Sequence, residues 1–406
     1  MDTRSIGNNI SLLRKQSGLT QLALANRLGV TDKAVSRWEN GLGYPDITLL
    51  PILAETFGVS IDQLLLGEKK GIAIAGNIIM DIVKSIENYP EAGMLTHISD
   101  ISYSVGGCVP NTAINLIKID RSIPVSAIGK VGTDENGRFI ISTLQKNGVN
   151  VNKITYAENV PTSFCDVMSV PGGERTFFTK RGANATFSPD DVDIDALNCD
   201  ILHIGYIMLL DVFDSYDEEY GTVLARFLSK VQARGIKTSV DAVSDSTGNF
   251  AEKFIPALKY CNYAIINEIE CCKIWNIEPY CTDGSLNKKN IRTAMSKMID
   301  AGVRDRVIIH CKETCFIMDS EKSFTEVASL NIPKENFKGS VGAGDAFCAG
   351  CLYGIYHKFQ DKQLLEFASA AAACSLFEAN AVDGMRNKNE IMLLAEKYGR
   401  YENEEK

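Results

Sequence analysis

The amino-acid sequence predicts a multidomain protein, in which a small all-α domain with a helix-turn-helix precedes an α/β domain that carries a small β-sheet lid. The length of 406 residues is too great for one ordinary domain. Residues 1–67 show helical periodicity alone, whereas strand-like and helical runs alternate over residues 71–398. The charge balance changes at about the same place. Residues 1–70 hold 8 Lys and Arg against 7 Asp and Glu, so the acidic excess of the chain lies in the longer part.

The composition is that of a globular protein, with 45% hydrophobic and 23% charged residues, and it excludes disordered and collagen-like classes. The longest apolar runs, such as Ile201–Leu210, are far shorter than the roughly 20 residues that a membrane span needs. The first residues lack the basic-then-apolar pattern of a secretory signal. We therefore expect a cytoplasmic protein that contacts no membrane.

The 12 Cys residues are scattered, and the cytoplasmic expectation favours reduced thiols. Two spacings, Cys311-x3-Cys315 and Cys348-x2-Cys351, invite a metal interpretation, but neither has a second ligand pair at zinc spacing. The sequence therefore favours buried or surface thiols over a metal site at these positions.

Five short helices are expected in residues 1–67. Four of the apolar runs end at a glycine, namely Gly18, Gly29, Gly41 and Gly58. The helix starts carry capping residues, which are Thr20, Thr31, the pair Pro45-Asp46 and the capping box Ser60-x-x-Gln63. Val35 and Trp38 are expected in the core. Gly29-Val30-Thr31 joins the second and third helices, and a glycine there permits the sharp turn of a helix-turn-helix.

These residues resemble the helix-turn-helix domain of the phage-repressor or Cro/XRE type. The matching text is Leu19-Thr20-Gln21, Leu28-Gly29-Val30-Thr31, Val35-Ser36-Arg37-Trp38-Glu39-Asn40-Gly41 and Tyr44-Pro45-Asp46. The resemblance implies binding to double-stranded DNA, with the start of the third helix at base edges in the major groove and Gln21 on a phosphate. The implied contact residues are Gln21, Asp32, Lys33, Ser36 and Arg37. The alternative is that they are ordinary solvated side chains.

The near-neutral charge of this domain is unusual for a DNA-binding module. We therefore expect modest binding by each monomer, and a homodimer that reads two half-sites.

The longer part alternates between strands and helices, which predicts a mostly parallel sheet. The expected strands are Ile72–Ile79, Ile123–Ile128, Ile201–Ile204, Thr238–Val240, Tyr263–Ile266 and Arg306–His310. The expected helices cover about 134–147, 216–234, 250–258, 287–301, 344–357, 361–379 and 388–398. Segments at about 94–105 and 160–180 break the alternation, and they predict a small separate β sheet, with 171–173 as a hairpin turn.

The strongest local signal is the glycine-rich segment from Gly339 to Phe347. Glycines let backbone N–H groups approach a phosphate, and a helix that starts near Ala343 adds its positive N-terminal end. Asp345 lies in the first turn of that helix, where the dipole is expected to hold its carboxylate ionised. Such a group is placed to accept a hydroxyl proton, although a glycine-rich loop alone is weak evidence.

Two further segments strengthen the interpretation. In Gly106-Gly107-x3-Asn111, a glycine turn that a ligand can approach closely is followed by the start of a helix. Asn111 places its side-chain amide at that helix start. Asn267 and Glu270 lie on one helical face just after a strand, and the carboxyl ends of strands are where open α/β sheets hold ligands.

Together these motifs resemble the PfkB, or ribokinase-like, family of carbohydrate kinases, from about Gly71 to Ala395. The matching pieces are Gly76-Asn77 with Asp81, Gly106-Gly107-Cys108-Val109-Pro110-Asn111, Ile128-Gly129-Lys130-Val131-Gly132-x-Asp134-x2-Gly137, Gly182-Ala183-Asn184, Asn267-x2-Glu270 and Gly342-Ala343-Gly344-Asp345. The resemblance implies a ribokinase-like α/β fold, a sugar or nucleoside substrate, and the cofactors ATP and Mg²⁺.

The resemblance also implies roles for single residues. Asp345 is the implied catalytic base, and Gly342, Ala343 and Gly344 form the implied anion hole. The implied substrate-binding residues are Asp81, Gly106, Gly107 and Asn111. Asn267 and Glu270 are implied to organise phosphates and Mg²⁺, the latter through water. The alternatives are helix or turn capping for Asp81 and Asn111, and a solvated helix face for Glu270.

The sequence departs from the family pattern at two places. Gly339-Ser340 replaces the usual Asp-Thr, whose carboxylate commonly helps to hold a monovalent cation. Lys312 and Cys315 replace two glycines that usually line the nucleotide phosphates, so Lys312 either neutralises phosphate charge or obstructs the site. Two functions follow: an ATP-dependent sugar kinase coupled to sequence-specific DNA binding, or a sugar-sensing transcription regulator with little or no catalysis. Substrate choice is left to variable positions, of which Arg175, Arg181 and Asn184 are candidates.

Overall fold

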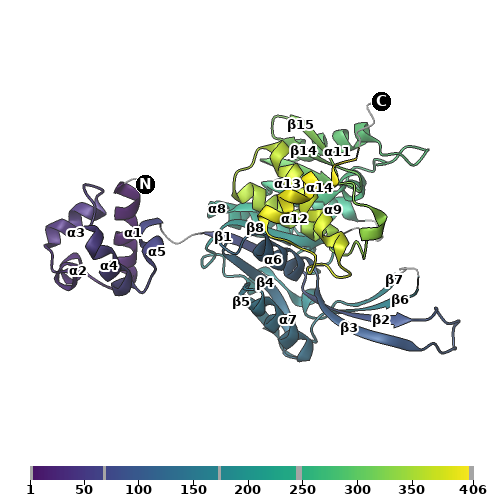
Figure 1. The fold of residues 1–406 in the computed structure, drawn as a ribbon, viewed down its shortest axis with the longest axis horizontal. Helices are drawn as coiled ribbons and strands as arrows, with labels where there is room; N and C mark the ends of the chain where they lie inside the picture. The colour runs from purple at the N-terminus through teal and green to yellow at the C-terminus, as the bar shows by residue number, and fades with distance from the viewer. Residues whose placement is uncertain (1–2, 67–69, 172–174, 244–248, 402–406) are drawn as a thin grey trace. The chain divides into compact units, whose positions relative to one another are not determined.

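The computed structural model describes residues 3–66, 70–171, 175–243 and 249–401, and Figure 1 shows its ribbon. The chain divides into two compact units, residues 1–70 and residues 71–406. The first is all-helical and the second is an α/β unit.

The first unit consists of five α-helices and one 3₁₀ turn. They are α1 (Thr3–Gln16), α2 (Gln21–Leu28), α3 (Asp32–Glu39), η1 (Ile47–Leu49), α4 (Leu50–Phe57) and α5 (Ile61–Leu66). The Thr20 and Thr31 hydroxyls accept the N–H groups of the residues three positions on, at 3.1 and 3.2 Å, as the capping pattern predicts. The fourth helix begins later than expected, because Asp46 caps the 3₁₀ turn and α4 follows it at Leu50.

The core of this unit contains the expected Val35 and Trp38 together with other apolar helix residues. Ile10, Leu24 and Val35 are fully buried, and Trp38 is nearly so. The left-handed backbone at Gly29 and at Gly58, each with φ of 67°, ends α2 and α4. The all-α expectation for this part of the chain is confirmed.

A nine-stranded sheet forms the centre of the second unit. Its strands in spatial order are β15 (Phe324–Ala328), β14 (Thr314–Asp319), β13 (Arg306–His310), β12 (Tyr263–Asn267), β11 (Lys237–Ala242), β8 (Cys199–Ile207), β1 (Gly71–Gly76), β4 (Val125–Gly132) and β5 (Asn150–Ala157). Pairing is parallel from β13 to β5, and β14 and β15 extend one edge as antiparallel strands. The mostly parallel sheet is therefore confirmed.

Helices cover both faces of this sheet (Figure 1). One face packs against α6 (Cys108–Ile119), α7 (Glu135–Lys146), α12 (Ala343–Tyr356), α13 (Asp361–Cys374) and α14 (Lys388–Tyr398). The other packs against α8 (Val223–Ala233), α9 (Phe250–Leu258), α10 (Glu268–Lys273) and α11 (Lys288–Asp300). Successive strand residues face opposite layers, so Ile72 and Ile74 join one apolar core and Ala73 joins the other.

A separate four-stranded sheet forms the lid, in the order β3 (Ile98–Gly106), β2 (Ile79–Ile86), β6 (Phe164–Ser169) and β7 (Arg175–Lys180). In Figure 1 it projects from the α/β layers. The strand expected over Ile72–Ile79 ends earlier, because the chain leaves the main sheet at Gly76 (φ 125°) and β2 joins the lid. The turn expected at 171–173 lies partly outside the described residues, although β6 and β7 pair as antiparallel neighbours.

Other elements differ from the expectation in detail. The helix expected from residue 216 begins at Val223, because β9 (Tyr216–Asp217) and β10 (Gly221–Thr222) form a short ribbon and Thr222 caps α8. Strands β5, β14 and β15 were not expected. The remaining 3₁₀ turns are η2 (Gly182–Thr186), η3 (Pro189–Asp191), η4 (Lys334–Asn336) and η5 (Ser375–Phe377). Within the described ranges, no helix has the length and apolar character to cross a membrane.

Candidate active site and DNA-contact surface

A pocket of about 220 Å³ lies where the parallel strands of the main sheet end. Tyr206 of β8, Asp241 of β11, Asn267 of β12 and His310 of β13 all line it from the carboxyl end of their strand or close to it. The start of α12 closes the pocket with Gly342, Ala343, Gly344 and Asp345. This is the edge at which open α/β sheets bind their ligands.

The glycine-rich segment shapes the start of α12 as the sequence predicted. Gly342 is the residue before the helix and has φ of 75°, and a Cβ there would lie 2.3 Å from the Ala381 Cβ. The first N–H groups of a helix have no partner within it, and although that of Ala343 donates to the Ser340 carbonyl, this positive helix end lines the pocket. At Gly339, the first departure from the family pattern, an added Cβ would lie 3.2 Å from the Glu378 carbonyl oxygen, which is tight for any side chain.

Asp345 is 5% exposed and receives two hydrogen bonds on one carboxylate oxygen. The Asn111 amide donates at 2.9 Å and the Tyr206 hydroxyl donates at 3.1 Å. Burial raises the pKa of Asp345 to about 6, and the two hydrogen bonds only partly oppose it. Desolvation is therefore the largest influence on this carboxyl group, a cost that the sequence alone does not show.

Of the predicted substrate-binding residues, Asn111 contacts this carboxylate, whereas Asp81 and Gly106 form a separate contact and, like Gly107, are absent from the pocket lining. Asn111, in the first turn of α6, contacts Asp345 directly, and its amide oxygen is buried with no partner among the described atoms. Gly106 lies against Asp81, because an added Cβ would be 2.1 Å from an Asp81 carboxylate oxygen. Gly107 has φ of 86° and begins α6. Neither Asp81 nor Asn111 serves as a helix cap.

Asp81 lies on the lid strand β2, and burial raises its pKa to about 6, with Arg175 opposing the shift. A half-buried carboxyl group beside a glycine turn suits hydrogen bonds to hydroxyl groups. The lid thus brings one carboxyl group against Gly106, at the end of β3 that leads into α6.

Asn267 and Glu270 combine a structural contact with a place in the pocket. They form a reciprocal capping box at the start of α10, with bonds of 3.1 and 2.7 Å between each side chain and the other residue's N–H. Glu270 is 4% exposed, so the alternative of a solvated helix face is wrong. Both residues also line the pocket.

Lys312 does not join these residues. It is exposed in the connection between β13 and β14, where Cys311 and Thr314 close the turn with a 2.9 Å backbone bond, and it is absent from the pocket lining. Of the candidate specificity residues, Asn184 bonds with both ends of its amide to the Ile78 backbone. Arg181 pairs with Asp211 at 2.9 Å.

Sequence reasoning missed Tyr206 and Asp241. Tyr206 has φ of 61°, and its N–H donates to an Asp241 carboxylate oxygen while its hydroxyl reaches Asp345. A non-glycine residue in the left-handed region is strained and is held there by its surroundings. The sequence carries no motif for this contact, because a tyrosine after an apolar run is common and the left-handed backbone leaves no mark in the residue types.

The helical unit presents the predicted DNA-contact residues on α3. Asp32, Lys33 and Arg37 are exposed, Ser36 is half-buried, and Val35 and Trp38 point into the core from the same helix. Gln21 differs from the others, because its amide donates to Glu39 at 2.8 Å. Glu39 also pairs with Arg14 at 2.6 Å, so this polar cluster ties α1, α2 and α3 together.

Two family descriptions match the chain. Residues 10–64 match the helix-turn-helix family, and residues 69–388 match the pfkB family carbohydrate kinases. Ribokinase of Schizosaccharomyces pombe is 24% identical over 329 residues, which are 79% of this chain and 96% of that protein. The HTH-type transcriptional activator BcrR of Enterococcus faecalis is 36% identical over 118 residues, 28% of this chain and 56% of that protein.

Solved structures agree on the fold of the larger unit. Arabidopsis thaliana ribokinase complexed with ribose and ATP has a TM-score of 0.66 at 20% identity, over 80% of this chain and 99% of that one. A putative ribokinase II from E. coli in complex with ATP and Mg²⁺ has a TM-score of 0.64 at 18% identity, over 81% and 100%. The pfkB match covers well over half of the chain, so the protein belongs to the pfkB family of carbohydrate kinases, phosphotransferases with a hydroxyl acceptor, and carries a helix-turn-helix domain before the kinase domain.

Proposed function

We propose that the protein phosphorylates a sugar or a related hydroxyl compound with ATP, and that Asp345 is the catalytic base. The observation that carries the proposal is the position of Asp345, which lies at the N-terminal end of α12 in the pocket and accepts a hydrogen bond from Asn111. The Schizosaccharomyces pombe relative named ribokinase, and the structural neighbour complexed with ribose and ATP, support this assignment.

The contacts give each residue a chemical task. The buried Asn111 amide oxygen lacks a partner among the described atoms, so a substrate hydroxyl is placed to donate to it beside Asp345. Asp345 then accepts the proton of the attacking hydroxyl. The first-turn N–H groups of α12 stabilise the charge on the transferring phosphoryl group, and Gly342 permits their close approach.

Mg²⁺ fits the donors that the pocket offers. Glu270 and Asn267 supply carboxylate and amide groups of the kind that this ion prefers, and both line the pocket. Their oxygens also accept capping bonds, so contact through water is the better match, as Mg²⁺ usually keeps several waters. When bound with ATP, Mg²⁺ would neutralise phosphate charge during transfer.

A panel of sugars and nucleosides, assayed for ADP release with ATP and Mg²⁺, tests the kinase proposal directly. We expect turnover with at least one member, and a thermal shift with the same compound. Binding without turnover across the whole panel would instead favour a sugar-sensing regulator. That second function is motivated by Gly339-Ser340 and by the position of Lys312 outside the pocket lining.

The pH dependence of catalysis is expected to follow the ionisation of the Asp345 carboxyl group. Burial raises its pKa to about 6, Asn111 and Tyr206 oppose that shift through hydrogen bonds, and the charges of Asp241 and His203 act in opposite directions. Only the ionised carboxylate accepts a proton, so kcat/KM should rise with pH through about 6 and then level off. Steady-state kinetics between about pH 5 and pH 8 would measure this, and a flat profile would contradict the assignment.

We further propose that the first unit binds DNA with sequence preference through α3. Arg37 is exposed on α3, and we place it at a base edge. Arg37→Ala is expected to weaken binding to a selected site by about 1–3 kcal/mol and to relax preference at one position. Competition binding at stated salt, with sites selected from a random library, would measure both effects. Lys15→Ala removes the same charge from an exposed position on α1 and should leave the preference unchanged.

We also propose that the protein acts as a homodimer through its lid. Ile101, Tyr103 and Phe178 are 45%, 57% and 56% exposed, and the register puts them on the lid face opposite to Asp81. A second copy would cover this apolar face and would supply the second DNA half-site. Sedimentation at micromolar concentration should give twice the 44.5 kDa chain mass, and Tyr103→Glu should shift it toward the monomer. A wild-type monomer would contradict the proposal.

A further inference from the structure

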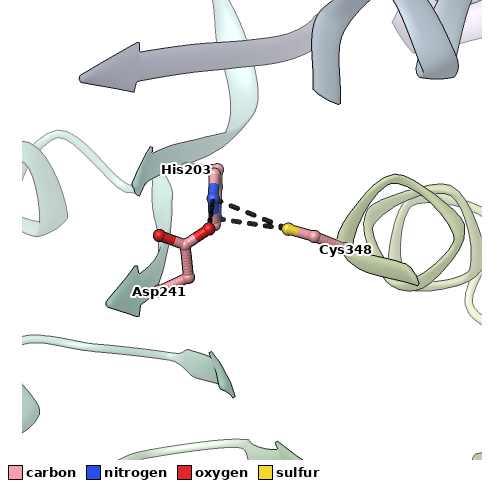
Figure 2. A group of neighbouring side chains, drawn as sticks. All are labelled: His203, Asp241 and Cys348. Carbon is pink, nitrogen blue, oxygen red and sulfur yellow. Dashed lines mark hydrogen bonds and ion pairs between the residues drawn. The ribbon is translucent and has the colours of Figure 1, made fainter. Parts of the chain in front are cut away.

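Three side chains from three separate elements converge beside the pocket (Figure 2). His203 comes from β8, Asp241 from β11 and Cys348 from α12, and all three residues are buried. The His203 Nε2 atom lies 3.2 Å from an Asp241 oxygen and 3.5 Å from the Cys348 sulfur. One potential ligand atom from each residue lies within 4.8 Å of the other two.

These separations agree with the edges of a tetrahedral metal site. Zinc binds nitrogen and oxygen at about 2.0–2.2 Å and thiolate sulfur at about 2.3 Å. At tetrahedral angles, neighbouring nitrogen and oxygen ligands are then about 3.3 Å apart, and nitrogen and sulfur ligands are about 3.6 Å apart. The two separations from Nε2 are close to those values, and the separation between the oxygen and the sulfur is no more than 4.8 Å, so coordination of an ion would require the three side chains to draw together and reorient.

The surroundings of the cluster are also those of a metal site. The second ring nitrogen of His203 lies 3.0 Å from the Ser239 hydroxyl, in the way that a ligating histidine is usually oriented by an outer partner. The second carboxylate oxygen of Asp241 accepts the Tyr206 N–H. His203 and Asp241 are therefore each held by an outer bond, whereas the Cys348 sulfur lies beside the imidazole ring, 3.5 Å from Nε2 and 3.9 Å from Nδ1.

We propose that His203, Asp241 and Cys348 bind a divalent transition metal of the zinc class. The nitrogen, oxygen and sulfur donors suit zinc or cobalt, whereas Mg²⁺ prefers oxygen alone, so this site is separate from the one that ATP requires. Asp241 and Cys348 line the pocket, which gives an ion a path from solvent. On binding, the Cys348 S–H bond breaks, a sulfur–metal bond forms and the proton passes to water.

The site is linked to the candidate catalytic base through one residue. Asp241 holds the Tyr206 backbone, and the Tyr206 hydroxyl donates to Asp345. Cys348 also follows Asp345 by one turn of α12. An ion held by this cluster would therefore adjoin the base, although binding itself does not depend on kinase activity.

The test is direct metal binding to the full-length protein without nucleotide. We expect one equivalent of Zn²⁺ to remain after dialysis, and Co²⁺ to give the thiolate charge-transfer band and visible bands of tetrahedral coordination. Cys348→Ser and His203→Gln should each weaken Zn²⁺ binding by at least about 100-fold, and Ser239→Ala by about 10–100-fold. Cys351→Ser is the matched control, because it alters an equally buried thiol on the same helix outside the cluster.

Two outcomes would overturn the proposal. One is a wild-type protein that retains no Zn²⁺, which would leave the cluster as an internal hydrogen-bond network. The other is Zn²⁺ binding that Cys348→Ser and His203→Gln do not change, which would place the ion at another site. If Cys348→Ser fails to fold, His203→Gln and the Co²⁺ spectrum of the wild-type protein still decide the question.

Discussion

Asp345→Asn is expected to lower kcat by about 10²–10⁴-fold and, at the same time, to stabilise the kinase domain. The loss of rate follows from the proposed proton transfer, because an amide accepts no proton from the substrate hydroxyl. Sugar binding should survive, since Asn111 and Tyr206 both donate to a single oxygen of Asp345, and the amide of Asn retains one oxygen.

The stabilisation follows from the sign of the pKa shift. The folded state raises the pKa of Asp345 from 3.8 to about 6, so folding disfavours its charged form. Wild-type stability therefore falls as the pH rises from the pKa of Asp345 in the unfolded state to its pKa in the folded state. Above the folded-state pKa, the protein carries the full penalty. At 1.36 kcal/mol for each pKa unit, the penalty is up to about 3 kcal/mol. The uncharged Asn variant avoids it.

Thermal unfolding at two pH values separates these effects. The Asn variant should melt above the wild type at about pH 8, and the difference should shrink at about pH 5, where Asp345 is protonated. Asp214→Asn is a matched control, because burial also raises the pKa of Asp214 to about 6 and this residue is absent from the pocket lining. It should leave kcat unchanged. Full turnover by Asp345→Asn would show that another group takes the proton.

The parts of the site that sequence could predict are those that lie in one continuous segment. Gly342 to Asp345 form a glycine turn and a first helical turn, and Asn267 with Glu270 form a strand end and a capping box. Their chemistry is local, so residue types and spacing were enough to place them. The same holds for the caps Thr20 and Thr31 of the first unit.

Contacts between distant segments could not be predicted in this way. Tyr206 meets Asp345 across 139 positions, and the Asn111 contact spans 234. The expected strand Ile72–Ile79 runs past the end of β1, because the apolar run continues through Gly76 and only the pairing of β2 with the lid reveals the break. The sequence spacing pairs Cys348 with Cys351, three positions further along the chain, whereas the fold places Cys348 beside His203 and Asp241. Sheet order, and not spacing, decides these groupings.

Glu39→Ala is expected to destabilise the helix-turn-helix unit strongly and to weaken DNA binding while leaving the kinase domain intact. The Glu39 and Arg14 side chains are only 6% and 10% exposed, and they pair at 2.6 Å. Burial alone would raise the pKa of Glu39, but its hydrogen bonds from Arg14 and Gln21 outweigh burial and lower it. The ion pair therefore stabilises the fold above the unfolded pKa and is lost as the pH falls.

The size of the effect comes from what the substitution leaves behind. Removing Glu39 leaves the buried Arg14 charge without its carboxylate partner, although the Leu19 carbonyl still accepts a hydrogen bond from it, and such a loss costs about 3–5 kcal/mol. That is a large part of the 5–15 kcal/mol that typically stabilises a domain. Fluorescence of Trp38 in a Trp275→Phe background would report this unit alone, since the chain has 2 Trp. Glu55→Ala, which removes an exposed carboxylate from α4, is the control and should change little.

A double substitution separates a buried-charge effect from simple loss of contacts. Replacing the pair by Arg14→Met with Glu39→Leu removes both charges and keeps apolar volume, so it should be more stable than Glu39→Ala alone. If the double variant is no better than the single one, the cluster acts mainly by holding α1, α2 and α3 through hydrogen bonds, including the one from Gln21. In that case Gln21 has a structural task that competes with its proposed phosphate contact, and Gln21→Ala should lower stability more than it lowers DNA affinity.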